Sequence, residues 1–352
     1  MSILPEDIIS DILSRLPVKT LLRFKCASKP WCGLIDGPDF IKMHFKRSTE
    51  HNTNLSLILT DDSLYSVDFD TLDYAVELDD PAHPRTEIVG SCNGLLCLGN
   101  AVSGSASIWN PSTRKHHNLP VSTIQTHPGC ICEFFIYGFG YDYAHDDYKL
   151  VKIIQLFDSV ESQVQVEFGI LASGALHWVV TRWPGLDMKI VVAFDVGLEE
   201  YREVPQPEYL GENFDMNLGV LGGFLCILCN YSQIRVDIWV MKEYGVKESW
   251  NKHFSVLDLE YTWSIKFIKP LAYSKCGDKV LLILNKEEFI WYDIEKKTVA
   301  NAEIRTIPDY FEAEICLGSL VTLNGDGGID GKKPRKKNWK RRISLAFMYC
   351  FC

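Results

Sequence analysis

The sequence predicts a small all-α module followed by a large all-β domain, and a repeat within the second part favours a β-propeller. The first 45 residues carry apolar side chains at helical spacing. From about Leu55, short runs with period two are separated by Gly, Asn, Asp and Pro, which indicates strands joined by turns. The strands recur in a degenerate repeat, and repeats of this kind must stack because no single unit can bury its own face.

The first predicted helix lies between Pro5 and Pro17. Its apolar residues recur at helical spacing and form one stripe: Ile8, Ile9, Ile12, Leu13 and Leu16. Pro5 suits a first helical turn, and Glu6 and Asp7 place negative charge where the helix dipole favours it. Pro17 ends the helix because proline is not tolerated in a helix interior.

Two more short helices are predicted before residue 46. The first carries Leu21 and Leu22, and Ser28 can cap the next, in which Trp31 and Ile35 share one side. So short a segment cannot bury this much apolar surface internally. The module is therefore predicted to bind another protein.

From Leu4 to about Phe45 the sequence resembles the F-box of plant F-box proteins. The matching phrases are Leu-Pro-Glu-Asp-Ile-Ile at residues 4–9 and Leu-Pro-Val-Lys-Thr-Leu-Leu-Arg-Phe-Lys-Cys at residues 16–26, followed by Ser28 and Trp31. The resemblance implies an F-box over residues 1–46 that docks on a Skp-type adaptor and so connects to a cullin–RING ubiquitin ligase. The adaptor contacts it implies are Leu4, Pro5, Ile8, Leu13, Leu16, Pro17, Leu21, Leu22 and Trp31.

The match has one departure, and one alternative stays open. Gly33 stands where the family prefers a better helix former, and it weakens the third helix by about 1 kcal/mol relative to alanine. The alternative is an ordinary helical subdomain that packs on its own protein.

The strand repeat has a recognisable unit. A Gly or turn residue opens an apolar strand, a second strand follows with an aromatic residue and an Asn or Asp, and a polar turn closes the unit. Units of this kind begin at Gly94, Gly174, Gly223 and Lys279. The glycines allow a tight start, and the tryptophans are predicted to fill the space between neighbouring sheets.

Residues 50–323 resemble the plant F-box-associated domain, a kelch-like propeller of S-locus (self-incompatibility) F-box proteins and of defence regulators of the CPR type. The phrases that match are Gly90–Cys97, Trp109–Arg114, Phe139–Asp142, Asp146–Val151 and Gly174–Trp178. Between Val166 and Gly174 the sequence lacks a segment that relatives carry there. One blade and one binding loop are therefore expected to differ from the family pattern.

Composition bounds the class of protein. Hydrophobic residues make up 47% of the chain, which is typical of a globular protein, and no run approaches the roughly 20 apolar residues of a membrane span. Twelve cysteines without a secretory signal indicate reduced thiols, and hence a cytoplasmic or nuclear location. Most of the chain is acidic, which argues against nucleic acid as the main ligand.

No residue pattern predicts catalysis, a cofactor or a metal. The sequence has no G-x-S-x-G, H-E-x-x-H or P-loop motif. Cys226 and Cys229 lie in a strand pattern at an odd separation, which points them to opposite faces. The adjacent His116 and His117 are expected in an exposed turn, and His177 is expected to be a hydrogen-bonded core residue. Asp142, Asp146 and Asp147 read as a hairpin turn rather than a calcium loop.

Residues 324–352 are predicted to be a disordered basic tail. Its basic residues can form a nuclear localisation signal, and they are Lys332, Lys333, Arg335, Lys336, Lys337, Lys340, Arg341 and Arg342. The alternative is a solvated tail without a function.

These observations favour a non-catalytic, substrate-recognition subunit of an SCF-type ubiquitin ligase, acting in ubiquitin conjugation. The F-box would hold the adaptor, and propeller loops such as Val121–Cys132 and Pro205–Asn217 would hold the target protein. Two alternatives stay open: a propeller lectin or enzyme with a helical cap, and an F-box protein that acts outside a ligase.

Overall fold

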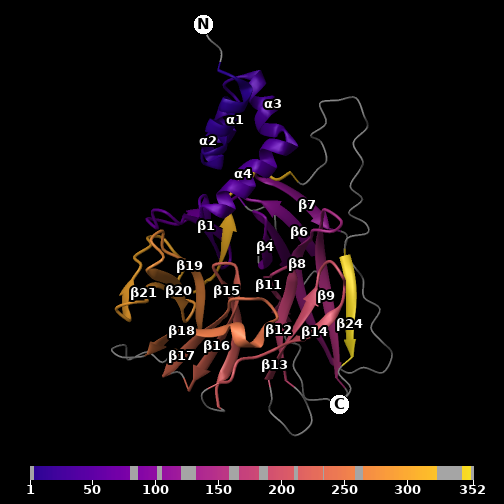
Figure 1. Cartoon of the computed structure of the whole chain (residues 1–352), viewed down its shortest axis with the longest axis vertical. Coiled ribbons are helices and arrows are strands. Elements are labelled where there is room, and N and C mark those ends of the chain that lie inside the picture. Colours follow the sequence, from indigo (N-terminus) through magenta and orange to yellow (C-terminus); the bar gives the residue numbers. More distant parts are fainter. Residues whose placement is uncertain are drawn as a thin grey trace. The chain divides into compact units, whose positions relative to one another are not determined.

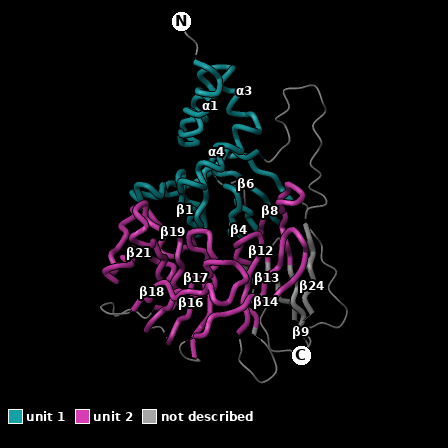
Figure 2. Tube along the Cα trace, in the orientation of Figure 1, with its two compact units in different colours: residues 1–121, 314–341 teal, residues 122–313, 342–352 magenta. Residues whose placement is uncertain are grey.

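The computed structural model describes residues 4–79, 86–100, 105–119, 132–157, 166–181, 189–209, 213–232, 234–257, 265–322 and 343–349. Figure 1 shows that helices come first in the chain and that strands follow them. The chain forms two compact units, residues 1–121 with 314–341 and residues 122–313 with 342–352 (Figure 2). The fold class predicted from the sequence, a helical module followed by a β-propeller, is confirmed.

Four helices open the first unit, one more than the sequence pattern predicted. They are α1 (Glu6–Ser14), α2 (Val18–Phe24), α3 (Lys29–Asp36) and α4 (Pro38–Glu50). Pro5 and Pro17 directly precede α1 and α2 with φ of −56° and −58°, so each proline presets the backbone entry of a helix. Ser28 precedes α3 as predicted, although its side chain makes no capping hydrogen bond.

The helices share a small core. Its buried residues are Leu13, Val18, Leu21, Ile35, Phe40 and Leu320. Leu320 lies after the last strand of this unit, so the helical module completes its core with a residue from the far end of the sequence. No local pattern in the first 50 residues could have indicated this contact.

Two four-stranded sheets complete the first unit. The first has the order β23-β1-β2-β3, with β1 (Leu55–Thr60), β2 (Leu64–Asp68), β3 (Val76–Glu77) and β23 (Glu312–Leu317). The second is the meander β4 (Glu87–Cys92), β5 (Leu95–Asn100), β6 (Ser105–Asn110) and β7 (Lys115–Leu119). Trp109 is 1% exposed and packs with Leu96, Leu98 and Cys316. It fills the space between sheets, as predicted for the tryptophans.

The second unit contains four four-stranded sheets. Three are antiparallel meanders in chain order. The first consists of β11 (Ile170–Ala172), β12 (Ala175–Thr181), β13 (Lys189–Asp195) and β14 (Tyr201–Val204). The second consists of β15 (Asp215–Leu221), β16 (Phe224–Tyr231), β17 (Arg235–Met241) and β18 (Trp250–Leu257), and the third of β19 (Ile268–Tyr273), β20 (Lys279–Leu284), β21 (Glu288–Asp293) and β22 (Thr298–Asn301). A 3-10 turn, η1 (Lys247–Ser249), precedes β18. The fourth sheet departs from this pattern. Its order is β10-β8-β9-β24, with β8 (Cys132–Asp142), β9 (Asp147–Phe157), β10 (Val166–Phe168) and β24 (Ile343–Tyr349).

The repeat read from the sequence has a physical basis in the turns. Gly94, Gly174 and Gly223 have φ of +75°, +77° and +83°, a left-handed conformation that favours glycine. The Asn or Asp that ends a strand also recurs as a turn residue. At Asn110 and Asp195, for example, the side-chain oxygen accepts the backbone N–H groups of the residues two and three positions later.

Several single-residue predictions can be compared with the structure. Cys226 and Cys229 do lie on opposite faces of β16, since they pack in two different core clusters. His177 is fully buried; its Nδ1 donates to the Ile170 carbonyl at 3.1 Å and its Nε2 accepts from the Tyr244 hydroxyl at 2.6 Å. That prediction is confirmed. His116 and His117 lie in strand β7, so their placement in an exposed turn was wrong.

The C-terminal segment also differs from its prediction. Residues 343–349 were expected to be disordered, yet they form β24, which pairs in parallel with β9 from Leu150 to Leu156. The basic residues Lys332 to Arg342 lie outside the described residues.

Candidate functional site

Helix α1 presents apolar residues on two faces. Its inner face contributes Leu13, which is 2% exposed, and the half-buried Ile9 to the core of the module. Its outer face carries Ile8 and Ile12, whose spacing of four residues places them above one another, and Leu4 lies two residues before the helix begins. Leu4, Ile8 and Ile12 are 55%, 46% and 48% exposed. We call these three residues the outer stripe.

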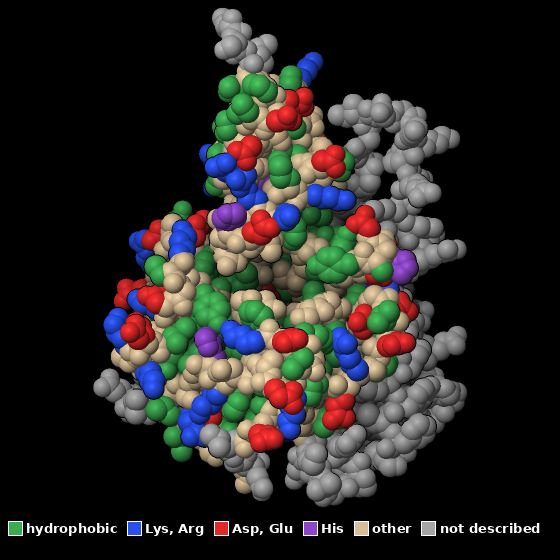
Figure 3. All heavy atoms as spheres, in the orientation of Figure 1, with side chains coloured by type: hydrophobic (Ala, Val, Ile, Leu, Met, Phe, Trp, Pro, Cys, Tyr) green, Lys and Arg blue, Asp and Glu red, His purple; other side chains and the backbone are tan. Residues whose placement is uncertain are grey.

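An exposed apolar stripe is informative because polar side chains on this face would not disturb the core of the module. Scattered exposed apolar residues are ordinary, but two in line on one short helix, with a third just before it, mark a contact surface. Figure 3 shows hydrophobic side chains between charged ones over the helices. Pro5 directly precedes α1, Pro17 directly precedes α2, and both are exposed.

The nine predicted contact residues fall into three groups. Leu4, Pro5, Ile8 and Pro17 are exposed. Leu16, Leu22 and Trp31 are half-buried against the core of the module. Leu13 and Leu21 are 2% and 0% exposed, so their side chains face the interior. Ile12 was left out of the predicted set, although its spacing from Ile8 could have identified it.

Helix α4 fixes the position of α1 through polar contacts. Arg47 Nη1 donates to Asp11 Oδ1 at 2.8 Å and to Ser14 Oγ at 2.7 Å. Arg15 donates to Asp11 Oδ2 at 2.7 Å. Hydrogen bonds from Arg47 and Arg15 lower the pKa of Asp11, so this carboxylate stays charged at neutral pH. The outer stripe is thus carried by a helix that is tied to its neighbour.

A buried histidine supports the turn between α1 and α2. His44 of α4 is 1% exposed, and its Nε2 donates to the Leu16 carbonyl oxygen at 3.0 Å. Its Nδ1 is buried without a hydrogen-bond partner. Burial lowers the pKa of His44 because the charged form would be poorly solvated, although the Leu16 contact opposes this effect. His44 is therefore neutral at pH 7 and holds the backbone next to Pro17.

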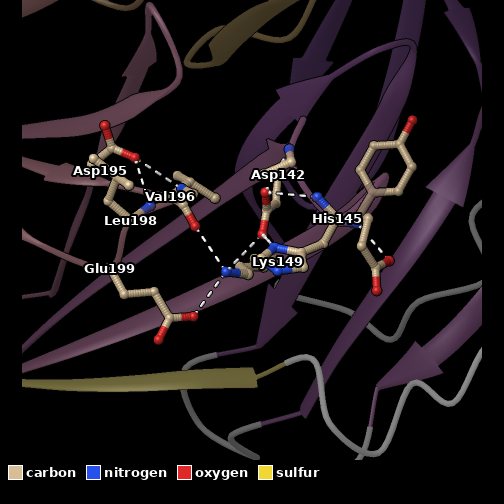
Figure 4. Close-up of polar contacts among 11 residues, drawn as sticks. Asp142, His145, Lys149, Asp195, Val196, Leu198 and Glu199 are labelled. Atoms are coloured by element: carbon tan, nitrogen blue, oxygen red, sulfur yellow. Dashed lines mark hydrogen bonds and ion pairs between the residues drawn. The ribbon is translucent and has the colours of Figure 1, made fainter.

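A second polar cluster lies in the second unit, around the fully buried carboxylate of Asp142 (Figure 4). Asp142 Oδ1 accepts the backbone N–H groups of Ala144 and His145, and Oδ2 contacts His145 Nδ1 at 2.7 Å and Lys149 Nζ at 2.9 Å. Burial alone would raise the pKa of Asp142, but the hydrogen bonds from Lys149 and His145 lower it to about 2. All the contacts of this carboxylate are structural, and the predicted hairpin turn is confirmed.

The two predicted target-binding loops have different outcomes. Residues 121–131 lie outside the described residues. In the other loop, the Trp250 indole donates to the Pro205 carbonyl at 2.7 Å, and the Tyr209 ring packs on Phe214 and Trp239 at centroid distances of 4.9 and 6.3 Å. The described part of this loop is therefore anchored on the core.

The described residues were compared with the patterns of a metal cluster and of a membrane-spanning helix, and they form neither. Across the residues whose placement is described, no group of three or more His, Cys, Asp and Glu side chains is arranged to hold a metal ion. None of the helices described above is long and apolar enough to cross a bilayer.

Two family models match consecutive parts of the N-terminal half of the chain. Residues 1–43 match the F-box domain, and residues 41–168 match the F-box associated beta propeller domain. The chain belongs to the F-box proteins. The first match covers α1, α2, α3 and the start of α4, which includes the whole outer stripe.

Relatives in Arabidopsis thaliana align with almost the full length of this F-box protein. F-box protein CPR1 is 37% identical over 98% of this chain and 95% of its own length. A second F-box protein is 31% identical over 96% of this chain and 94% of its own, and an F-box/kelch-repeat protein is 30% identical over 91% and 96%. An F-box implies a Skp-type binding partner, and proteins of this family are typically non-catalytic adaptors.

Proposed function

We propose that this F-box protein is the substrate-recognition subunit of an SCF-type ubiquitin ligase and has no catalytic chemistry of its own. The observation that carries the proposal is the outer stripe, an exposed apolar surface within the F-box match. The propeller would bind a target protein, and the adaptor would link it to a cullin–RING enzyme. The contribution to rate would be proximity, because the target's lysines are held near the charged ubiquitin carrier.

The apolar residues of the helical module have different roles in this proposal, according to how deeply each side chain is buried. In this proposal the adaptor contacts Leu4, Ile8 and Ile12 directly, together with Pro5 before α1 and Pro17 before α2. The half-buried Leu16, Leu22 and Trp31 offer only the exposed part of their side chains. Leu13 and Leu21 act from the interior, where they keep α1 and α2 in place.

The outer stripe provides a test that leaves the core of the module intact. The variant Ile8→Ser with Ile12→Ser is compared with Lys42→Ser with Lys46→Ser, which changes two exposed residues of α4. Truncation of central apolar anchors costs about 2 kcal/mol or more, so the first variant should bind a purified Skp-type adaptor at least about 30-fold more weakly in calorimetry. The α4 variant should bind like the wild type. Equal binding by all three proteins would refute the adaptor surface.

The ligase itself needs a second measurement. The wild-type chain, expressed in plant cells, should co-purify with a cullin, and the Ile8→Ser, Ile12→Ser variant should not. Adaptor binding without any cullin would instead support a function outside a ligase. Fractionation of the same cells tests the proposed cytoplasmic or nuclear location.

A further inference from the structure

The sheet β10-β8-β9-β24 is assembled unlike the other sheets of its unit. In the other three sheets, consecutive strands pair antiparallel along the whole meander. Here only β8 and β9 form such a hairpin, paired from Cys132–Phe157 to Asp142–Asp147. Both flanking strands run parallel to their neighbours, with β10 beside β8 and β24 beside β9.

The reason lies in the chain that follows β9. In the sheet that begins with β11, the chain continues after β12 into β13 and β14, which supply the outer half of the sheet. After β9 ends at Phe157, the next described strand is the short β10, which lies on the other side of β8. The next sheet then begins at Ile170. Among the described residues, no strand close to β9 in the sequence lies on its outer edge.

An open edge of this length would expose a row of unpaired backbone N–H and C=O groups. Such an edge is a template for any extended chain and must be covered or paired. In this structure residues 343–349 pair with it, from Ile343 beside Leu150 to Tyr349 beside Leu156 (Figure 1). A segment remote in sequence thus occupies a place that a consecutive strand fills in the neighbouring sheets.

We propose that the outer edge of β9 is a strand-acceptor site, which residues 343–349 occupy in cis and which an extended peptide segment running parallel to β9 can occupy in their place. Main-chain hydrogen bonds would supply most of the affinity, as in other cases of strand addition. Parallel pairing is slightly weaker per residue than antiparallel pairing, and β24 is the last strand of the sheet, so exchange breaks one ladder only. That the exchanging segment belongs to a ligase target rests on the proposed function.

The face of β9 that can be described is suited to hold a strand in register. Val151 is 0% exposed and packs with Leu176, Trp178 and Phe194 of the next sheet. Leu150 is 5% exposed, so β9 is fixed on the scaffold at the start of the β24 ladder. The acceptor strand would therefore keep its position when its partner strand leaves.

The test uses the full chain with β24 disrupted in two alternative ways. In an edge strand, alternate N–H groups face the neighbouring strand and the others face solvent. One variant carries Leu345→Pro and Phe347→Pro, and the other carries Ala346→Pro and Met348→Pro. Hydrogen exchange of those β9 amides between Leu150 and Leu156 that face β24 reports the pairing, since the alternate amides bond to β8. A labelled synthetic peptide of residues 341–351 reports the acceptor site.

At least one variant should lose protection of these β9 amides and should bind the peptide. Peptide binding should then restore the protection of the amides. The wild type should bind the same peptide at least about 10-fold more weakly, because a tethered strand competes at an effective concentration near the millimolar range. Unchanged β9 protection in both variants would overturn the proposal. So would lost protection without peptide binding, or equal peptide binding by the wild type. No arm involves adaptor or ubiquitin, so failure here is distinguishable from failure of the proposed ligase function.

Discussion

The ammonium group of Lys149 lies 2.9 Å from the carboxylate of Asp142, whose side chain has no solvent exposure. Lys149 also donates to the Val196 carbonyl at 2.9 Å and to Glu199 at 2.8 Å, in the turn after β13. One lysine therefore joins the turn between β8 and β9 to the corresponding turn of the next sheet (Figure 4). Two neighbouring sheets of the second unit are tied by this contact as well as by apolar packing.

The first prediction concerns the buried partner of this pair. Asp142→Asn should lower the free energy of unfolding by about 3 kcal/mol, because Lys149 loses its buried counter-charge. Glu199→Gln is the matched control: Glu199 is 50% exposed, so its loss should cost less than about 1 kcal/mol. Denaturant unfolding followed by tryptophan fluorescence measures both. Similar losses in the two variants would contradict the structural role of Asp142.

We also expect the Asp142 carboxylate to make the stability of the folded protein depend on pH in the acidic range. The pKa of Asp142 falls from an ordinary 3.8 to about 2 on folding, so the folded state binds fewer protons in this range. The stabilisation is fully present above the unfolded value and is lost as the pH falls from about 4 toward about 2. Asp142→Asn should remove this part of the acid sensitivity, which melting temperatures between pH 5 and pH 2.5 would detect.

The second prediction compares two turn glycines with the same backbone. Gly94 and Gly174 both have positive φ, but a Cβ on Gly94 would lie 2.3 Å from the Leu317 carbonyl and 2.5 Å from Ser319 Oγ. A Cβ on Gly174 would meet no atom within 4 Å. Gly174→Ala should therefore cost only the conformational strain of about 1 kcal/mol, whereas Gly94→Ala must also displace backbone and should cost at least twice as much. Thermal melting of the two variants decides, and equal melting points would be the adverse result.

The third prediction concerns His44. Its pKa is lowered in the folded state, so the unfolded chain takes up a proton first as the pH falls. The contribution of His44 is fully present above its ordinary pKa of 6.5 and is lost below it. Circular dichroism of the helices should show lower stability at pH 5.5 than at pH 7.5. His44→Gln can still donate to the Leu16 carbonyl and should flatten this difference; an unchanged difference would assign it to another group.

The fourth prediction separates the basic cluster from β24. Replacing Lys332, Lys333, Arg335, Lys336, Lys337, Lys340, Arg341 and Arg342 by Gln should lower the nuclear fraction of a fluorescent fusion without changing its melting temperature. Deleting residues 343–352 should lower the melting temperature, because β9 loses its partner strand. An unchanged distribution of the Gln variant would favour a solvated segment without a signal.

Much of the fold could be predicted because its causes are local. Helical spacing and the prolines at residues 5 and 17 define the start of the helical module, and the left-handed glycines mark the strand turns. The outer stripe was only partly recognised. The apolar stripe read from the sequence of the first helix contains both Ile12 and Leu13, which are adjacent and equally apolar. In the structure only Leu13 is buried.

The sequence by itself determined the two-part architecture, the F-box resemblance and the turn chemistry, since each depends on residues close together in the chain. The tertiary structure alone decided which apolar residues face outward, because burial depends on what packs against a helix. Leu320 closes the helical core, and residues 343–349 pair with β9, from positions far along the chain. Backbone groups at an open edge accept an extended segment from any point in the chain, so no local pattern identifies the strand that fills it.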